Sequence, residues 1–363
     1  MRVGYFAPLP PARTGVADYA AALLTALRRH GDVRTGEDGD IALYQIGNNQ
    51  LHRDIYRRAI EKPGVVVLHD AVLQHFFLGN LSENAYVEEF AYNYGAWTED
   101  FARSLWSQRA RSGMDGRYFA WPMLRRIAQT AKAVIVHNPA AAAMVRTHAP
   151  EAEIVEIPHL FVRPPMPPGY AVERLRGSWD AGGSTFVFGV FGHLRESKRV
   201  PAVLRAFARV REMVDARLLV AGGFVSRDLE QAAAPLLRAP GVVHGGYVRE
   251  DEFWLRAAAV DACINLRYPA AGETSGISIR LMGIGKPVLL SASEENARFP
   301  EASCVRVDPG MGEEDMLVET ITWLARNPND ALAMGALAAA HIEREHAVDR
   351  VAQLFWDVLR RHS

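Results

Sequence analysis

The chain of 363 residues is long for one domain and comfortable for two. Its hydrophobic fraction of 49% and charged fraction of 23% are those of an ordinary globular protein that buries sizeable cores. The formal net charge of -1 lacks the basic excess that nucleic-acid partners usually require, so we expect no nucleic-acid ligand.

The cysteines and the lengths of the apolar runs indicate in which cellular compartment the protein is expected. Cys263 and Cys304 are typical of small buried side chains in a reducing environment, rather than of a disulfide framework or a metal site. The apolar run at the start of the sequence is too short for a signal peptide, and no stretch approaches the roughly 20 apolar residues of a membrane span. We therefore expect a cytoplasmic protein that is at most peripheral to a membrane.

Strand and helix patterns alternate through the first part of the chain. A helical pattern covers Val16–Arg29, and the insertion Glu83–Thr130 predicts two or three further helices. We interpret the aromatic side chains of the insertion as core and its arginines as a solvated face; the alternatives are an acceptor groove and attraction to an anionic membrane. Helices between strands imply a parallel sheet covered on both faces. The predicted strands are Arg2–Phe6, Ile41–Gln45, Val65–His69 and Ala133–His137.

A Pro-dense stretch, Pro158–Pro168, then interrupts the pattern and is the best linker candidate, because it can continue neither a helix nor a central strand. The alternation restarts after it, and Ala347–Arg360 closes the chain as an amphipathic helix. We place one domain at residues 1–164 with 347–363, and a second at residues 165–346. The predicted strands of the second domain are Thr185–Phe191, Arg217–Ala221, Gly241–His244, Asp261–Leu266 and Pro287–Ser291.

The segment Asn265–Ser291 carries the clearest chemical pattern. A helix begins at Thr274, Ser275 and Gly276, whose small side chains leave backbone N–H groups uncovered, and such a helix start favours phosphate oxygens. Glu273 precedes it and can accept hydrogen bonds from hydroxyl groups. A phosphate cradle beside a hydroxyl acceptor suits a sugar nucleotide, although an ordinary turn between strand and helix gives a similar pattern.

This segment resembles the signature of the retaining glycosyltransferases of the GT-B fold, in the large family four (group 1), and within it a sub-branch with a G-E-T-S-G variant. The family's second glutamate, which contacts the nucleotide ribose, is replaced here by Arg280 or Leu281. The resemblance implies two Rossmann-like domains with parallel sheets facing a central cleft, and a C-terminal helix that crosses back to the first domain. The matching residues are Glu273, Gly276, Gly285, Pro287 and Val288.

A second motif, Phe191–Arg199, follows an apolar strand and leads into a helix. Gly192 permits a close backbone approach, and Arg195 and Lys198 place cations where a diphosphate would lie; a solvated helix start is the alternative. In the family that this motif resembles, basic residues at this point neutralise the leaving diphosphate. His193 stands where the family usually has an arginine, so it is the weaker donor contact.

Three further positions come from the same resemblance. The loop after Gly246 resembles the one whose main chain holds the nucleobase. Gly15 corresponds to a glycine that approaches the donor phosphate and the acceptor. His69, at a strand end, corresponds to a histidine near the donor sugar. His69, Asp70 and His75 have no standard zinc spacing, so we expect no metal.

The resemblance implies a retaining hexosyltransferase that moves a sugar from a UDP- or GDP-sugar to a hydroxyl of a glycan, glycolipid or small molecule, in polysaccharide or glycoconjugate synthesis. No cofactor is expected beyond the donor. The alternatives are a sugar-nucleotide epimerase, which would need paired carboxylates, and a binding protein without activity. We expect Glu273, His69 and Lys198 to be catalytic, with Glu273 and Lys198 on cleft loops whose substitution spares the fold. The expected donor-binding residues are Gly15, Gly192, His193, Arg195, Lys198, Gly246, Tyr247, Val248, Glu273, Thr274, Ser275, Gly276 and Arg280.

Overall fold

The computed structural model describes residues 1–12 and 14–363, which form two compact units. Unit 1 comprises Met1–Val162, Pro269–Thr274 and Glu345–Ser363. Unit 2 comprises Arg163–Tyr268 and Ser275–Arg344. Each unit contains one parallel sheet with helices on its faces, so the predicted α/β fold class is confirmed. The short segment Pro269–Thr274 lies in the sequence between the two stretches of unit 2, but its contacts assign it to unit 1.

The sheet of unit 1 has six parallel strands in the order β2-β1-β3-β4-β5-β6. The four predicted strands are confirmed with ends that agree to within a residue, whereas the edge strands β2 and β6 were not predicted. The bounds are β1 (Arg2–Phe6), β2 (Asp32–Thr35), β3 (Ile41–Ile46), β4 (Val65–Leu68), β5 (Ala133–Val136) and β6 (Ile154–Glu156).

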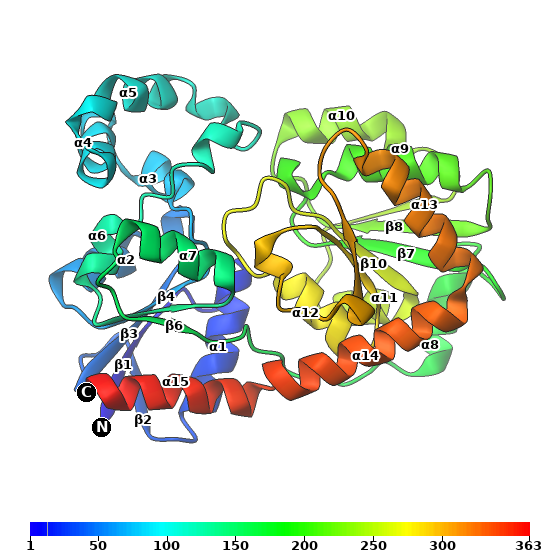
Figure 1. Ribbon diagram of the computed structural model, residues 1–363. Helices are drawn as coiled ribbons and strands as arrows, with labels where there is room; N and C mark the ends of the chain where they lie inside the picture. The colour runs from blue at the N-terminus through cyan, green and yellow to red at the C-terminus, as the bar shows by residue number, and fades with distance from the viewer. Residues whose placement is uncertain (13) are drawn as a thin grey trace. The chain divides into compact units, whose positions relative to one another are not determined.

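Helices cover both faces of this sheet (Figure 1). On one face α1 (Gly15–Leu27) and α15 (Val348–His362) pack on inward residues such as Leu43, Val67 and Ile135. The C-terminal helix therefore returns to the first unit, as predicted. The other face is covered by α2 (Arg53–Glu61), α6 (Arg125–Thr130) and α7 (Pro139–His148).

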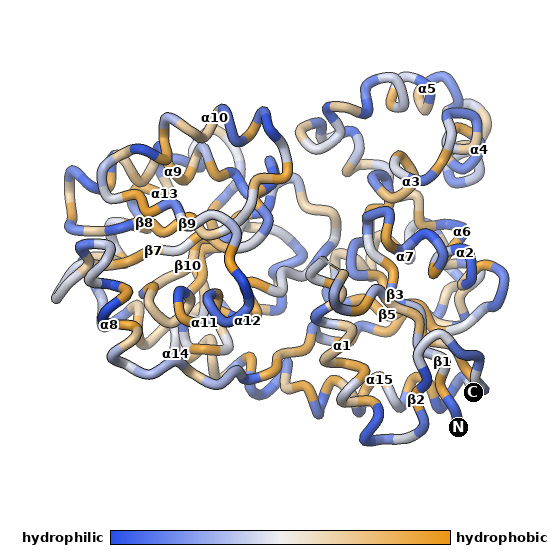
Figure 2. The backbone as a smooth tube through the Cα atoms, turned by 180° about the vertical axis from the view of Figure 1, so that it is seen from behind, coloured by the Kyte–Doolittle hydropathy of each residue, from blue (hydrophilic) through white to orange (hydrophobic). Residues whose placement is uncertain are grey.

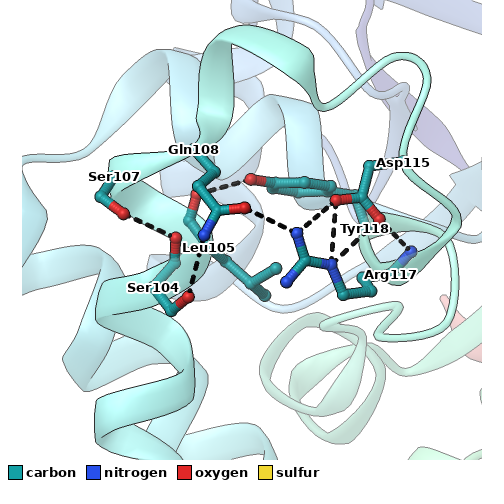
Figure 3. A network of polar contacts seen from close by, with 7 residues as sticks. All are labelled: Ser104, Leu105, Ser107, Gln108, Asp115, Arg117 and Tyr118. Carbon is teal, nitrogen blue, oxygen red and sulfur yellow. Dashed lines mark hydrogen bonds and ion pairs between the residues drawn. The ribbon is translucent and has the colours of Figure 1, made fainter.

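The predicted insertion Glu83–Thr130 contains three α-helices, α4 (Glu83–Tyr94), α5 (Glu99–Ser107) and α6, as expected. With the preceding α3 (Gln74–Asn80), α4 and α5 form a lobe of unit 1. Its aromatic rings pack mainly on one another, as expected for a core, but Trp97 is 80% exposed. Figure 3 shows how the end of the lobe is held: the Arg117 guanidinium donates to Asp115 and Gln108, and the Tyr118 hydroxyl donates to Leu105 O at 2.6 Å. The positive charge of Arg117 is therefore paired within the lobe.

The sheet of unit 2 also has six parallel strands, in the order β12-β11-β10-β7-β8-β9. Five of them were predicted, and the edge strand β12 was not. Figure 2 shows hydrophobic strand segments in this unit enclosed by helices of mixed hydropathy, as a sheet buried on both faces requires. The bounds are β7 (Phe186–Phe191), β8 (Ala216–Ala221), β9 (Val242–Gly246), β10 (Ala262–Asn265), β11 (Val288–Ser291) and β12 (Cys304–Val307).

The helices of unit 2 follow the strands on both faces, and α14 carries the chain back toward α15. Their bounds are α8 (Gly169–Gly177), α9 (Val200–Val210), α10 (Arg227–Leu237), α11 (Glu250–Ala259), α12 (Gly276–Gly283), α13 (Glu313–Arg326) and α14 (Pro328–His346). Both cysteines are buried free thiols, so the expectation of small buried side chains is confirmed. Burial raises the pKa of the Cys263 thiol to about 12.

Candidate functional site

The carboxyl ends of β7 and β10, two neighbouring strands of unit 2, hold a buried polar network around Lys198. The Lys198 ammonium donates to the carbonyl of Phe191, the last residue of β7, and at 2.9 Å to Asn265 Oδ1 at the end of β10. The Asn265 amide nitrogen donates in turn to Ser275 Oγ at 2.7 Å and to Ser278 Oγ at 2.6 Å. One amide thus ties the lysine to the start of α12.

Lys198 is only 4% exposed, so its ammonium is a buried group of this network. The lysine ends the short 3-10 helix Glu196–Lys198, which turns its side chain back under the strand ends. Because backbone and amide oxygens hold the ammonium, its removal would leave buried acceptors without a donor and would cost stability. The assumption that a Lys198 substitution spares the fold therefore has no support.

The predicted phosphate cradle forms the first turn of α12. Ser275 is the N-cap residue, and its Oγ accepts from Ser278 N at 3.4 Å. The remaining N–H groups of the first turn have no carbonyl partner within the helix, and the helix dipole adds positive potential there. With Lys198 joined to this turn through Asn265, a cation and free N–H donors occur at one edge of the sheet, which is a chemistry suited to an anion.

Glycine is required at two points of this edge. Gly192 has φ +85°, and a side chain there would meet Ile277 Cγ1 at 3.3 Å, in the first turn of α12. A Cβ at Gly222 would lie 1.9 Å from Gly192 O, so the loops after β7 and β8 approach each other too closely for any side chain. Leu194 N also donates to Gly223 O at 2.9 Å. The sequence pattern identified Gly192 but missed Gly222.

His193 and Arg195 are exposed at the same loop. Packing around the imidazole, and then the charges of Arg195 and Lys198, lower the pKa of His193, although part of the residue is exposed. The ring is thus neutral near pH 7 and offers a hydrogen bond rather than a charge. Arg195 lies outside the Lys198 network and remains a predicted contact.

The nucleobase loop predicted at Gly246 follows β9. Gly246 has φ +59°, Tyr247 is 63% exposed and Val248 is half-buried. The loop leads directly into α11, whose first residue is Glu250. These residues lie on one loop, and none of them contributes to the Lys198 network.

Arg280 is held by α11. Its guanidinium lies 3.9 Å from the ring centre of Phe253 and 4.4 Å from that of Trp254, and it pairs with Glu250. Trp254 Nε1 donates to the same Glu250 oxygen, at 2.9 Å. Arg280, one of the two residues predicted to stand at the position of the second glutamate, therefore joins α12 to α11, and its positive charge is already paired.

Within unit 1 the segment before α12 is anchored by backbone and amide groups. Ala71 N donates to Ala271 O at 2.8 Å, and Asn138 Nδ2 donates to Gly272 O at 2.9 Å and Thr274 Oγ1 at 3.0 Å. The Glu273 carboxylate accepts from Ala271 N at 2.7 Å, which fixes its side chain against its own loop. Gly272–Thr274 thus belong to unit 1, and Ser275 and Gly276 to unit 2.

The other predicted residues of unit 1 lie on different elements. Gly15 is the first residue of α1, with nothing within 4 Å of a Cβ at that position, and Thr14 is its N-cap. His69 follows β4 and is 8% exposed. Its Nε2 lies 2.7 Å from Gln45 Oε1, and its ring is 4.7 Å from that of Tyr19 and 5.3 Å from that of His137.

Two residues of these networks were not singled out as site residues in the sequence: Asn265 and Gln45. Each is an amide side chain at the carboxyl end of a strand, so position relative to strand ends was the available signal. Among the described residues no three His, Cys, Asp or Glu side chains gather in a metal-binding geometry. No helix in the described part of the chain is long and apolar enough to cross a membrane.

No family model and no curated protein sequence matches the chain. Solved structures do. Sucrose-phosphate synthase from Thermosynechococcus elongatus is similar with a TM-score of 0.72 at 14% identity, over 99% of both chains. HepE of Anabaena, in complex with UDP-glucose, is similar with a TM-score of 0.66 at 14% identity, over 99% of this chain and 100% of that one. WaaG, a glycosyltransferase involved in lipopolysaccharide biosynthesis, has a TM-score of 0.63 at 15% identity, over 97% and 99%. At these identities the likeness shows the fold, the two-domain α/β fold of GT-B glycosyltransferases.

Proposed function

We propose that the protein is a glycosyltransferase that uses a nucleoside-diphosphate sugar and retains the anomeric configuration, in the manner of family four. The observation that carries the proposal is the network at the edge of the unit 2 sheet, in which Asn265 joins the Lys198 ammonium to the first turn of α12. The fold adds support, since HepE is a structural neighbour whose crystals contain UDP-glucose. The G-E-T-S-G sequence at the same point supports the sub-branch.

The chemistry explains why such an edge is useful. In the transfer, the bond between the anomeric carbon and the diphosphate oxygen breaks, and a bond from the acceptor oxygen forms. The acceptor proton passes to an oxygen of the departing diphosphate. Negative charge therefore builds on the leaving group, and preorganised N–H donors with a fixed cation stabilise that charge without reorganising. Lys198, Ser275 and Gly276 carry this role, assisted by Arg195 and a neutral His193.

The other predicted residues complete the proposed donor contacts. The Gly246, Tyr247 and Val248 loop holds the uracil or guanine base, Gly192 admits the diphosphate to the backbone, and Glu273 and Thr274 orient the sugar hydroxyls. Gly15 approaches the phosphate, and His69 lies near the anomeric centre. Arg280 supports the base loop by holding the start of α11, which follows that loop directly. The reaction needs no cofactor beyond the nucleotide-sugar donor. The acceptor is a glycan, glycolipid or small molecule of polysaccharide or glycoconjugate synthesis.

A donor panel tests the proposal. Purified protein is incubated with UDP- and GDP-sugars, with and without simple hydroxyl acceptors and with EDTA, and the products are identified by mass spectrometry. We expect slow release of UDP or GDP from one donor, undiminished by EDTA, and a product with the donor's anomeric configuration. Epimerised sugar nucleotide, or nucleotide binding with no turnover of any donor, would overturn it.

The Glu273 assignment has its own variant. Glu273→Gln keeps an oxygen that can accept from Ala271 N, so the loop should persist. We expect turnover of the donor to fall by about 10- to 100-fold, the loss of one charge-assisted hydrogen bond to a hydroxyl. Glu294→Gln, at an exposed position of unit 2, is the control and should be unchanged. Wild-type turnover in Glu273→Gln would remove Glu273 from the site.

A further inference from the structure

A layer of neutral polar side chains covers the α1 face of the unit 1 sheet at its carboxyl edge. The inward residues of three adjacent strands are apolar up to Leu43, Val67 and Ile135. The residue two positions later, which projects from the same face, is polar in each case. These residues are Gln45, His69 and His137, and with Tyr19 of α1 we call them the polar layer.

The polar layer is buried but only partly hydrogen-bonded. Gln45 is fully buried, and Tyr19, His69 and His137 are 4%, 8% and 6% exposed. Among the described residues, Tyr19 Oη, Gln45 Nε2 and His137 Nε2 are buried without a hydrogen-bond partner, as is Nε2 of the adjacent His52. Buried polar groups are nearly always paired, so a set of unpaired ones at a strand edge indicates function rather than stability.

The partners of each imidazole determine which nitrogen carries the proton. His137 Nδ1 lies 2.9 Å from Ile157 O and His52 Nδ1 lies 2.9 Å from Gln45 O. A carbonyl only accepts, so both rings hold their proton on Nδ1. For His69 the neighbour is different: Gln45 Oε1, an amide oxygen that also only accepts, lies 2.7 Å from Nε2. His69 thus carries its proton on the opposite nitrogen.

We propose that Gln45 is a positioning residue that fixes His69 as the Nε2–H tautomer, so that His69 Nδ1 accepts a hydrogen bond from a substrate hydroxyl. A neutral acceptor suits a sugar hydroxyl, because the hydroxyl is itself uncharged and donates one hydrogen bond. The substrate part of this inference rests on the proposed function. The tautomer part does not.

The surroundings keep His69 neutral. Burial, followed by His137, His159 and His52, lowers its pKa well below the usual value. Tyr19 faces the ring from α1, and burial likewise raises the pKa of its hydroxyl. Buried histidine, tyrosine and glutamine side chains surround the ring, and the groups that shift its pKa are histidines. His69 therefore has no anionic partner that would favour a proton on Nδ1.

The tautomer is measured directly on the full chain labelled with ¹⁵N-histidine. At pH 7.5 we expect the His69 resonances, assigned by their loss in His69→Gln, to show a protonated Nε2 and an unprotonated Nδ1. Gln45→Leu should convert this signal to a mixture of tautomers. A protonated Nδ1 in the wild type, or an unchanged signal in Gln45→Leu, overturns the proposal whatever the activity of the protein.

The kinetic test uses a charge in place of the amide. Gln45→Glu puts a carboxylate beside His69 and favours the imidazolium, so turnover of the donor should fall roughly tenfold or more at pH 6 and recover by pH 8.5. Gln74→Leu is the matched control, because Gln74 is a fully buried glutamine of the same unit that bonds Tyr86 and Trp121. It should cost stability and leave the pH profile unchanged. An identical profile in Gln45→Glu overturns the role of His69, while absence of turnover in the wild type speaks only against the proposed function.

Discussion

The carboxyl edges of the two sheets have the same architecture and opposite chemistry. In unit 2 a buried ammonium, Lys198, is satisfied by oxygens of Phe191 and Asn265 and joined to a helix start. In unit 1 the corresponding edge holds the polar layer, whose histidines are neutral and whose polar atoms are partly unpaired. One edge is organised for negative charge and the other for neutral hydroxyl groups. The fold supplies the place, and the residues at the strand ends decide the ligand.

The largest effect that tests this comparison is the response of stability to pH. Burial lowers the pKa of His52 and of His137 to about 4, against about 6.5 in an unfolded chain. Between these values the unfolded state binds more protons, so stability is lost as the pH falls below 6.5 and the loss is complete near pH 4. At pH 5 we expect a loss of roughly 2 kcal/mol for each histidine.

Urea unfolding at pH 7.5, 6 and 5, followed by a tyrosine or tryptophan signal from unit 1, measures this loss. His137→Gln should reduce the dependence on pH by about a third, because burial lowers the pKa of His52, His69 and His137 alike. His30→Gln, at a half-buried position outside the polar layer, should not change it. A stability that is constant from pH 7.5 to 5 would mean that the polar layer is charged or hydrated, and the contrast between the two edges would disappear.

The second effect concerns the cationic edge. Lys198→Met removes the charge and retains much of the side-chain volume, so affinity for UDP or GDP should fall by about 10- to 100-fold, the loss of one charge-assisted hydrogen bond. Stability should also fall, by about 1–3 kcal/mol, since Asn265 Oδ1 and Phe191 O lose their donor. Calorimetric titration with each nucleotide, on samples shown to be folded by circular dichroism, separates the two losses.

Lys286→Met provides the control for Lys198→Met. Lys286 donates to Ala258 O at 3.0 Å, and burial lowers the pKa of its ammonium, so it too is a half-buried lysine of unit 2 that holds a carbonyl. It should lose stability and keep nucleotide affinity. Equal affinity in Lys198→Met and the wild type would show that the anion edge is structural.

The fold was largely predictable from the sequence, and the failures are physically related. Central strands such as Val65–Leu68 are buried on both faces and give continuous apolar runs. Three strands were missed, β2, β6 and β12, and each is an edge strand of three or four residues with polar side chains. Edge strands are short and partly solvated, so the hydrophobic pattern that identifies a strand is weak there.

The candidate site was less predictable, because its contacts join residues far apart in the sequence. The Gly-Glu-Thr-Ser-Gly pattern located a helix start, and a local pattern is enough for that. Asn265 and Gln45 were not predicted as site residues, because a single amide at a strand end belongs to no recognisable sequence motif. The role of such an amide depends on the neighbouring strand across the sheet. The burial of Lys198 was missed for a similar reason: it comes from a 3-10 turn that the charged motif around it concealed.

The smallest expected effect is that of Arg280, and it would sharpen the comparison by showing that the positive charge of this residue stabilises the fold of unit 2 and does not bind the ligand. Arg280 lies over Phe253 and Trp254 and pairs with a 63% exposed Glu250 carboxylate. Arg280→Ala should lower the free energy of unfolding by about 1 kcal/mol, mainly through the aromatic contacts, because exposed ion pairs contribute little. Arg280→Lys keeps the charge but loses the planar stack and should recover only part of this loss.

A double-mutant cycle with Glu250→Gln should give a coupling of about 0.5 kcal/mol that weakens in 0.5 M salt. If Arg280→Ala instead abolishes nucleotide binding at unchanged stability, Arg280 contacts the ligand, and unit 2 would offer a further cation in addition to Lys198 and Arg195.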